Sequence, residues 1–264
     1  MVTGRLGRTL LRIATTLTLL FIYAPIALVF AYALNESAST AWPPIGFSFK
    51  WILEAFRNTA LIEAFLSSVI VASGATVIAL VLGTLASAAV HRYRFFGREA
   101  ISFVVIFPIA LPGIITGIAL ATSFAQLDFP LGILSIVVGH ATFCIVIVYN
   151  NVVARLRRMS PNVVEASSDL GASGWQTFRW VIWPNLATAV LAGGVLAFAL
   201  SFDEIIVTTF TRGSEPTLPI YIYNSLFRPR NKPVTNVVAL LAITVTFVPV
   251  LVAQLLTRDR ESAR

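Results

Sequence analysis

The chain has 264 residues, of which 57% are hydrophobic and 12% are charged, and its net charge is +7. Soluble domains carry about 25% charged residues, so this composition excludes an ordinary soluble protein and predicts an integral membrane protein. We expect the positive charge to follow from membrane topology and from contact with anionic lipid headgroups. Nucleic-acid binding is not expected, because the sequence has no basic soluble patch for it.

Six apolar runs approach the roughly 20 residues that a helix needs to cross a bilayer. They cover residues 11–34, 65–90, 101–125, 131–154, 186–210 and 237–256. Lipid satisfies no backbone hydrogen bonds, and the runs do not alternate as barrel strands do, so each run is predicted to be a helix. The predicted fold class is all-α: one polytopic membrane domain over residues 1–264, with six transmembrane helices.

The first run follows Arg5, Arg8 and Arg12 and includes Ala31-Tyr32-Ala33, which resembles a signal-peptidase site. An apolar run of about 20 residues is longer than the roughly 7–15 residues of a signal peptide. We therefore favour an uncleaved first span, with a cleaved signal as the alternative.

Two short helices are predicted between the spans. Residues 48–57 place charged residues on one helical face and apolar residues on the other; these are Lys50, Glu54 and Arg57, and Phe49, Ile52, Leu53 and Phe56. This helix is expected to lie along the membrane surface or to pack against the outer ends of other spans. Residues 218–226 predict an interfacial helix, with an external gate, a partner contact or a lid over the bundle as alternatives.

The third run is interrupted by prolines and glycines. Pro108 and Pro112 each remove a helix hydrogen bond, and Gly113 and Gly117 permit close helix contact. Broken helices within the membrane often line a substrate path. Ordinary kinked packing is the alternative interpretation.

The fifth run contains the adjacent carboxylates Asp203 and Glu204. Ionisable groups within the membrane are costly and suggest a functional site. Adjacent side chains on a helix are about 100° apart, so we expect one carboxylate to meet a cationic substrate and the other to pair with an arginine or reach the interface. A carboxylate paired within the bundle is the alternative.

Few other residues suggest chemistry. His140 is expected to hydrogen-bond locally rather than to relay protons, and the single Cys144 is expected to be a small buried side chain. One cysteine forms no internal disulfide, and metal sites need clustered ligands. The sequence therefore predicts no metal site and no catalytic residue.

Basic residues are distributed unequally between the connections. Thirteen of the nineteen Lys and Arg residues lie in the two tails and in the connections that follow the second and fourth runs. The positive-inside rule places these segments in the cytoplasm. Both termini and the connection at about 155–185 are thus predicted to be cytoplasmic.

This cytoplasmic connection has helix start and stop signals. Ser160 and Pro161 suit an N-cap and first helical position, and Gly171 is a typical residue after a helix end. Ser173 and Gln176 form a capping box for a second helix, which residue 184, a proline, is expected to end.

The two helices would form a hairpin that is apolar on one side. The predicted apolar stripes are Val163, Val164 and Leu170 on the first helix, and Trp175, Phe178 and Ile182 on the second. Glu165 and Asp169 lie on the other side. The hairpin either packs beneath the bundle or docks as a rigid knob into a groove of a cytoplasmic partner.

The hairpin resembles the EAA loop of permease subunits of binding-protein-dependent ABC importers. The resemblance is carried by Glu165-Ala166-Ser167, Gly171-Ala172, Phe178 and Pro184. The family pattern is Glu-Ala-Ala, then Gly, then Ile-x-Leu-Pro; here Ser167 replaces the second alanine and Trp183 replaces the leucine. The resemblance implies the type I importer permease fold. It also implies that Glu165, Ala166, Asp169, Leu170 and Gly171 couple the chain to an ATPase.

The same resemblance implies a multi-pass protein of the bacterial inner (plasma) membrane. Its implied partners are a second permease subunit, two ATPase subunits and an external substrate-binding protein. The chain is expected to be a transport subunit rather than an enzyme and to bind no cofactor. It has no GxxxxGK[ST] phosphate loop, so ATP and Mg are expected on the partner ATPase.

Within this family, residues 201–210, 217–223 and 233–239 resemble the spermidine/putrescine permeases. Two acidic residues suit a polyamine cation. The candidate substrate-path residues are Asp203, Glu204, Pro108 and Pro112. The alternatives are a permease of the same kind for ferric iron, sulfate or an amino-acid-like solute, and an ion-driven secondary transporter.

Overall fold

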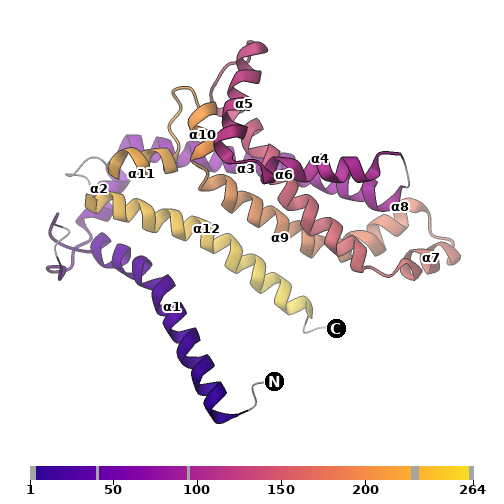
Figure 1. Ribbon diagram of the computed structural model, residues 1–264, viewed down its shortest axis with the longest axis horizontal. Helices are drawn as coiled ribbons and strands as arrows, with labels where there is room; N and C mark the ends of the chain where they lie inside the picture. The colour runs from indigo at the N-terminus through magenta and orange to yellow at the C-terminus, as the bar shows by residue number, and fades with distance from the viewer. Residues whose placement is uncertain (1–3, 40–41, 94–95, 227–231, 262–264) are drawn as a thin grey trace. The chain divides into compact units, whose positions relative to one another are not determined.

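The computed structural model describes residues 4–39, 42–93, 96–226 and 232–261 (Figure 1). These residues are almost entirely helical, with an isolated bridge between Asn35 and Phe47, so the all-α prediction is confirmed. The chain divides into two compact units, Met1–Leu61 with Ile222–Ile243 and Ile62–Tyr221 with Thr244–Arg264. Several arginines that enter the charge count lie outside the described residues; they are Arg94, Arg228, Arg230 and Arg264.

Among the described residues, five helical stretches are long and apolar enough to cross a membrane. They are α1 (Arg5–Ala33), α3 (Thr59–Arg92), α6 (Ile133–Arg158), the stretch Gly174–Phe202 and, within α12 (Lys232–Glu261), Pro233–Val252. A sixth span results if α4 (Arg98–Ala110) and α5 (Gly113–Gln126), which are bent by 106°, are counted together. The stretch Gly174–Phe202 consists of α8 (Gly174–Thr177), the π-helix η1 (Phe178–Ile182) and α9 (Trp183–Phe202). The shorter elements outside it are α2 (Lys50–Arg57), α7 (Pro161–Asp169), α10 (Ile206–Thr211) and α11 (Leu218–Leu226).

In the first unit, buried Asn35 organises the loop that follows α1. Its side-chain carbonyl oxygen accepts from the Ile45 N–H at 2.9 Å, and its backbone carbonyl accepts from the Trp51 indole N–H at 2.8 Å. The loop is thereby fixed to α2, the helix predicted at 48–57. Only part of the predicted apolar face of α2 is packed: Ile52 is half-buried, whereas Phe49, Leu53 and Phe56 are exposed.

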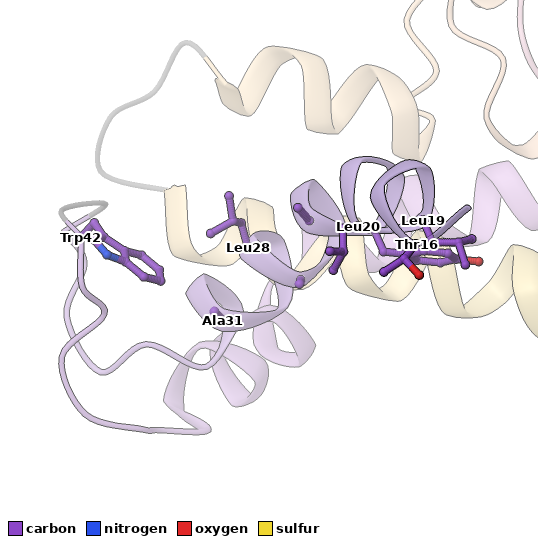
Figure 2. Close-up of a pocket in the computed structure, with 9 residues that line it drawn as sticks. Thr16, Leu19, Leu20, Leu28, Ala31 and Trp42 are labelled. Atoms are coloured by element: carbon purple, nitrogen blue, oxygen red, sulfur yellow. The ribbon is translucent and has the colours of Figure 1, made fainter. Parts of the chain in front are cut away.

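Helix α1 carries an apolar groove of about 670 Å³ on its exposed surface. Figure 2 shows Thr16, Leu19 and Leu20 along one part of the groove, and Leu28 and Trp42 toward the other end. None of the apolar window of α1 is buried. Such a surface is suited to a hydrocarbon environment, in which apolar side chains need no cover.

The core of the second unit lies where α3 and α9 meet α6. Buried residues from these helices form one cluster, which includes Ala75, Ala79, Cys144, Val148, Val152, Leu186 and Ala197. Close approach depends on small residues. A Cβ added at Gly193 of α9 would lie 3.1 Å from the Val148 Cα, and one at Gly83 of α3 would lie 3.0 Å from the Ile145 carbonyl. Helices in membranes commonly pack through such small residues, because apolar contact alone does not drive their association.

Helix α11 begins at a buried anchor. Leu218 is fully buried, and its backbone N–H donates to the Ser68 hydroxyl of α3 at 2.8 Å. The sequence correctly predicted a helix at 218–226. This end of the helix is packed into the second unit.

Candidate functional site

The connection at 155–185 contains a helix that ends in a left-handed glycine. Helix α7 starts after Ser160, with Pro161 in its first turn, and Gly171 has φ = +78°. The Gly171 N–H donates to the Ser168 carbonyl at 2.9 Å, and the Ala172 N–H donates to the Ser167 carbonyl at 3.1 Å. These two bonds form a Schellman motif, so the predicted turn at Gly171 is confirmed. Ser160 occupies the N-cap position, but its side chain makes no capping hydrogen bond.

The second helix of the hairpin does not end at Pro184, contrary to the sequence prediction. Ser173 and Gln176 form the predicted capping box, but α8 continues through η1 into α9 up to Phe202. A proline lacks an N–H and clashes with the carbonyl four residues earlier. The π-turn directly before Pro184 already interrupts that pattern, so the helix accommodates the ring. The second helix of the hairpin is therefore the beginning of the membrane stretch Gly174–Phe202.

The five predicted coupling residues gather on an exposed end of the hairpin. Glu165, Ala166, Asp169 and Gly171 are exposed, and Leu170 is 88% exposed. The predicted apolar stripe of α7 is therefore only partly packed, because Leu170 points to solvent. The two helices of the hairpin are joined by a hydrogen bond between the hydroxyls of Ser167 in α7 and Thr177 in α8, at 3.0 Å.

The third predicted span consists of two helices that meet at a sharp break. Figure 1 shows α5 standing away from the line of α4, in accord with their 106° bend. Pro108 lies inside α4, and Pro112 is the N-cap of α5. A bend of this size exceeds an ordinary proline kink, so the interpretation as a broken helix is correct.

The fifth predicted span is also broken, which the sequence interpretation did not anticipate. Helix α9 ends at Phe202, residues 203–205 are not helical, and α10 begins at Ile206. Asp203 and Glu204 are therefore not in a helix, and the expected angle of about 100° between their side chains does not apply. Glu204 Oε1 accepts from the Ile206 and Val207 N–H groups at 2.7 and 3.0 Å. Glu204 thus caps the start of α10, where a carboxylate is stabilised by the helix dipole.

Asp203 differs from its neighbour. The residue is exposed, and its carboxylate has no side-chain hydrogen bond to another described residue. Neither Asp203 nor Glu204 forms an ion pair within the described part of the chain, so the predicted arginine partner is not found there.

The two breaks line one cavity of about 180 Å³. Its wall is formed by Pro108, Ile109, Leu111, Gly113, Thr116, Phe143, Leu200, Glu204 and Val207. Of the four predicted substrate-path residues, the structure brings Pro108 and Glu204 together here, while Pro112 and Asp203 do not line the cavity. Thr116, which sequence reasoning missed, contributes a buried hydroxyl oxygen without a hydrogen-bond partner among the described residues.

The glycines of α5 allow α10 to approach closely, as the sequence predicted. Gly117 faces the Phe210 ring so closely that a Cβ there would overlap it, whereas a Cβ at Gly113 would lie 3.4 Å from Ile206 Cγ2, an ordinary contact. The contact between α5 and α10 is therefore tight at one glycine and relaxed at the other.

This difference predicts opposite outcomes for two matched substitutions. Gly117→Ala should destabilise the assembled protein by about 1–3 kcal/mol, as overpacking does, whereas Gly113→Ala should be close to neutral. Thermal melting in detergent measures both. Phe210→Leu should restore part of the loss caused by Gly117→Ala; equal melting temperatures for the two glycine variants would show that the close contact is absent.

Together, the broken helices, the cavity and the exposed hairpin define a membrane permease. Residues 79–261 match the family of binding-protein-dependent transport system inner membrane components, and the chain belongs to this family. It is a multi-pass membrane protein and a transport subunit rather than an enzyme.

Two relatives resemble the chain over most of its length. It is 32% identical to the spermidine/putrescine transport system permease protein PotC of Haemophilus influenzae, over 90% of this chain and 92% of that protein. It is also 32% identical to the putrescine transport system permease protein PotI of Escherichia coli (strain K12), over 84% of this chain and 82% of that protein.

Solved structures share the fold. A bacterial ABC transporter involved in the import of the acidic polysaccharide alginate aligns with a TM-score of 0.73 and 14% identity, over 96% of this chain and 95% of that chain. An amino acid ABC transporter with histidines aligns with a TM-score of 0.62 and 14% identity, over 81% of this chain and 100% of that chain. These likenesses confirm the predicted type I importer permease fold, and at such identity they describe the fold alone.

Proposed function

We propose that the chain is the permease subunit of an ATP-driven importer of polyamines and forms part of the translocation path. The observation that carries the proposal is Glu204 in the wall of the cavity where both broken helices meet. Polyamines bear protonated amines at neutral pH, and the carboxylate of partly buried Glu204 attracts them electrostatically. The names of the two relatives support the same substrate class.

The hairpin is the proposed contact with a separate ATPase. Glu165, Ala166, Asp169, Leu170 and Gly171 present a protruding surface of mixed polarity. Two ATPase subunits, which bind ATP and Mg, would act on this chain and on a second permease subunit. An external binding protein would deliver the polyamine. This arrangement requires the hairpin and both termini to lie in the cytoplasm of a bacterial cell, on the inner face of its inner membrane.

A continuous helical stretch connects the proposed coupling surface to the cavity. Gly174–Phe202 has 29 residues, which corresponds to about 43 Å of α-helix. One of its ends continues from the Gly171 turn, and the other ends at the break beside Glu204. Arg155 of α6 donates from Nε to the Asn185 carbonyl of this stretch at 2.8 Å, so the core holds it near the π-turn. Movement of the hairpin by the ATPase would therefore be transmitted along α9 to the break.

The test is ATP-dependent uptake by the complete transporter in proteoliposomes. We expect labelled spermidine or putrescine to accumulate only when ATP and the binding protein are present. Accumulation should continue when ion gradients across the membrane have been collapsed. Uptake that follows an ion gradient without ATP would identify a secondary transporter. Uptake of sulfate, ferric iron or an amino acid in place of polyamine would reject the proposed substrate.

A further inference from the structure

A buried histidine joins the two sides of the break in the fifth span. His140 of α6 is 1% exposed. Its Nδ1 lies 2.8 Å from the Ser201 hydroxyl in the last turn of α9, and its Nε2 lies 2.8 Å from the Thr208 hydroxyl of α10. These two hydroxyls flank the non-helical residues 203–205. One imidazole ring therefore holds both helix ends at the break.

The hydrogen bonds of Thr208 determine which atoms donate and which accept in the bonds around His140. Its hydroxyl oxygen also lies 2.7 Å from the Glu204 carbonyl oxygen. A carbonyl only accepts, so the Thr208 hydroxyl must donate to it, and that hydroxyl must accept from His140 Nε2–H. Ser201 then donates to the unprotonated Nδ1. The bonds are complete for a neutral ring with its proton on Nε2.

This chain of bonds controls the position of Glu204. The Glu204 carbonyl is held through Thr208, and its carboxylate is held by the first N–H groups of α10. At the far end of α10, the Ser135 hydroxyl of α6 donates to the Thr211 carbonyl at 2.7 Å. Helix α10 is thus bonded to α6 at both ends. Among the described contacts, only the bonds at the end near His140 also involve Ser201 and Glu204.

We propose that His140 is a positioning residue that sets the geometry of the break and so aims the Glu204 carboxylate into the cation path. This inference rests on the proposed function of Glu204 in cation transport. A ring that donates at one nitrogen and accepts at the other satisfies both flanks of the break simultaneously. An apolar side chain of similar size would leave the Ser201 hydroxyl without its ring partner and would remove the bond that the Thr208 hydroxyl accepts, so the link between α9 and α10 through the ring would be lost.

The test uses the complete transporter in proteoliposomes and measures spermidine transported per ATP hydrolysed. His140→Leu is expected to lower this ratio about tenfold, the effect of removing a buried hydrogen-bonded partner. His140→Gln should retain most of it, because one amide supplies both a donor and an acceptor. Ser135→Ala is the control, since it removes the hydroxyl contacts with Thr211 of α10 and with Gly132 at the start of α6, all away from Glu204, and its ratio should stay near that of the unaltered protein.

Coupling between residues separates a positioning role from general packing. If His140 acts through Glu204, His140→Leu should cause no further loss in a Glu204→Gln background. Additive losses, or a His140→Gln variant as defective as His140→Leu, would overturn the positioning role of His140 and leave the proposed cation site unaffected. Normal transport by Glu204→Gln would instead overturn the cation site. If His140→Leu does not reach the membrane, Thr208→Val replaces it, because it removes the connecting hydroxyl at nearly constant volume; a normal ratio in that variant would also reject the proposal.

Discussion

Gly171→Val is expected to lower ATP-driven uptake about tenfold while leaving the amount of protein in the membrane unchanged. Gly171 has φ = +78°, and a β-branched residue is a rare outlier in this conformation. The left-handed backbone costs about 1–2 kcal/mol for a residue with a side chain, and about 1.4 kcal/mol reduces an equilibrium constant tenfold. The hairpin would therefore rarely adopt the turn that presents Glu165 and Leu170. Uptake and immunoblotting of membranes measure the two quantities.

Gly171→Asn is the matched control for the turn. A Cβ at this position would meet no atom within 4 Å, and asparagine adopts the left-handed region far more readily than valine. This variant should keep most of the uptake if the turn is what matters. Equal losses in both variants would show that the ATPase contacts the glycine surface itself. Normal uptake by Gly171→Val would show that coupling does not depend on the turn.

Local signals made the hairpin predictable from sequence. The glycine turn and the Ser173–Gln176 capping box each depend on residues within a few positions of one another. Apolar run length likewise indicated the membrane helices, because the bilayer thickness sets that length. The prediction that Pro184 ends the second helix was wrong, because the π-turn before Pro184 allows the helix to continue.

The geometry of the cavity could not be predicted in the same way. Apolar residues continue on both sides of Asp203 and Glu204, so run length gave no sign that α9 ends at Phe202. The adjacent carboxylates were the available signal, since an N-terminal helix cap satisfies such a group. The partners of His140 lie 61 and 68 residues away, and Thr116 of α5 lines the cavity together with residues of α4, α6, α9 and α10. These contacts depend on tertiary packing, which local sequence patterns do not reveal.

The structure assigns different expected effects to the two carboxylates. Glu204 lines the cavity and caps α10, whereas Asp203 is exposed and does not line it. If the cavity is the cation path, neutralising Glu204 should matter more than neutralising Asp203. Both changes remove one negative charge near the same break, so a difference between them reports position rather than charge.

Glu204→Gln is expected to reduce spermidine uptake at least tenfold, with only a small fall in the melting temperature of the assembled transporter, because the charge at the helix N-terminus contributes about 0.3–1 kcal/mol. The glutamine amide oxygen can still accept from the Ile206 and Val207 N–H groups, so the helix cap remains and only the charge is lost. A charged hydrogen bond contributes about 1.5–3 kcal/mol, and about 1.4 kcal/mol corresponds to a factor of ten. Asp203→Asn is expected to reduce uptake less than Glu204→Gln does, because its carboxylate lies outside the cavity wall.

Initial rates of labelled spermidine uptake, with the binding protein saturated, measure both variants. Unchanged uptake by Glu204→Gln would mean that the carboxylate serves only as a helix cap, and Glu204→Ala should then cause a loss of stability without a specific loss of transport. A larger effect of Asp203→Asn would move the cation path from the cavity to the exposed side of the break. The ranking of the two variants therefore locates the path relative to α10.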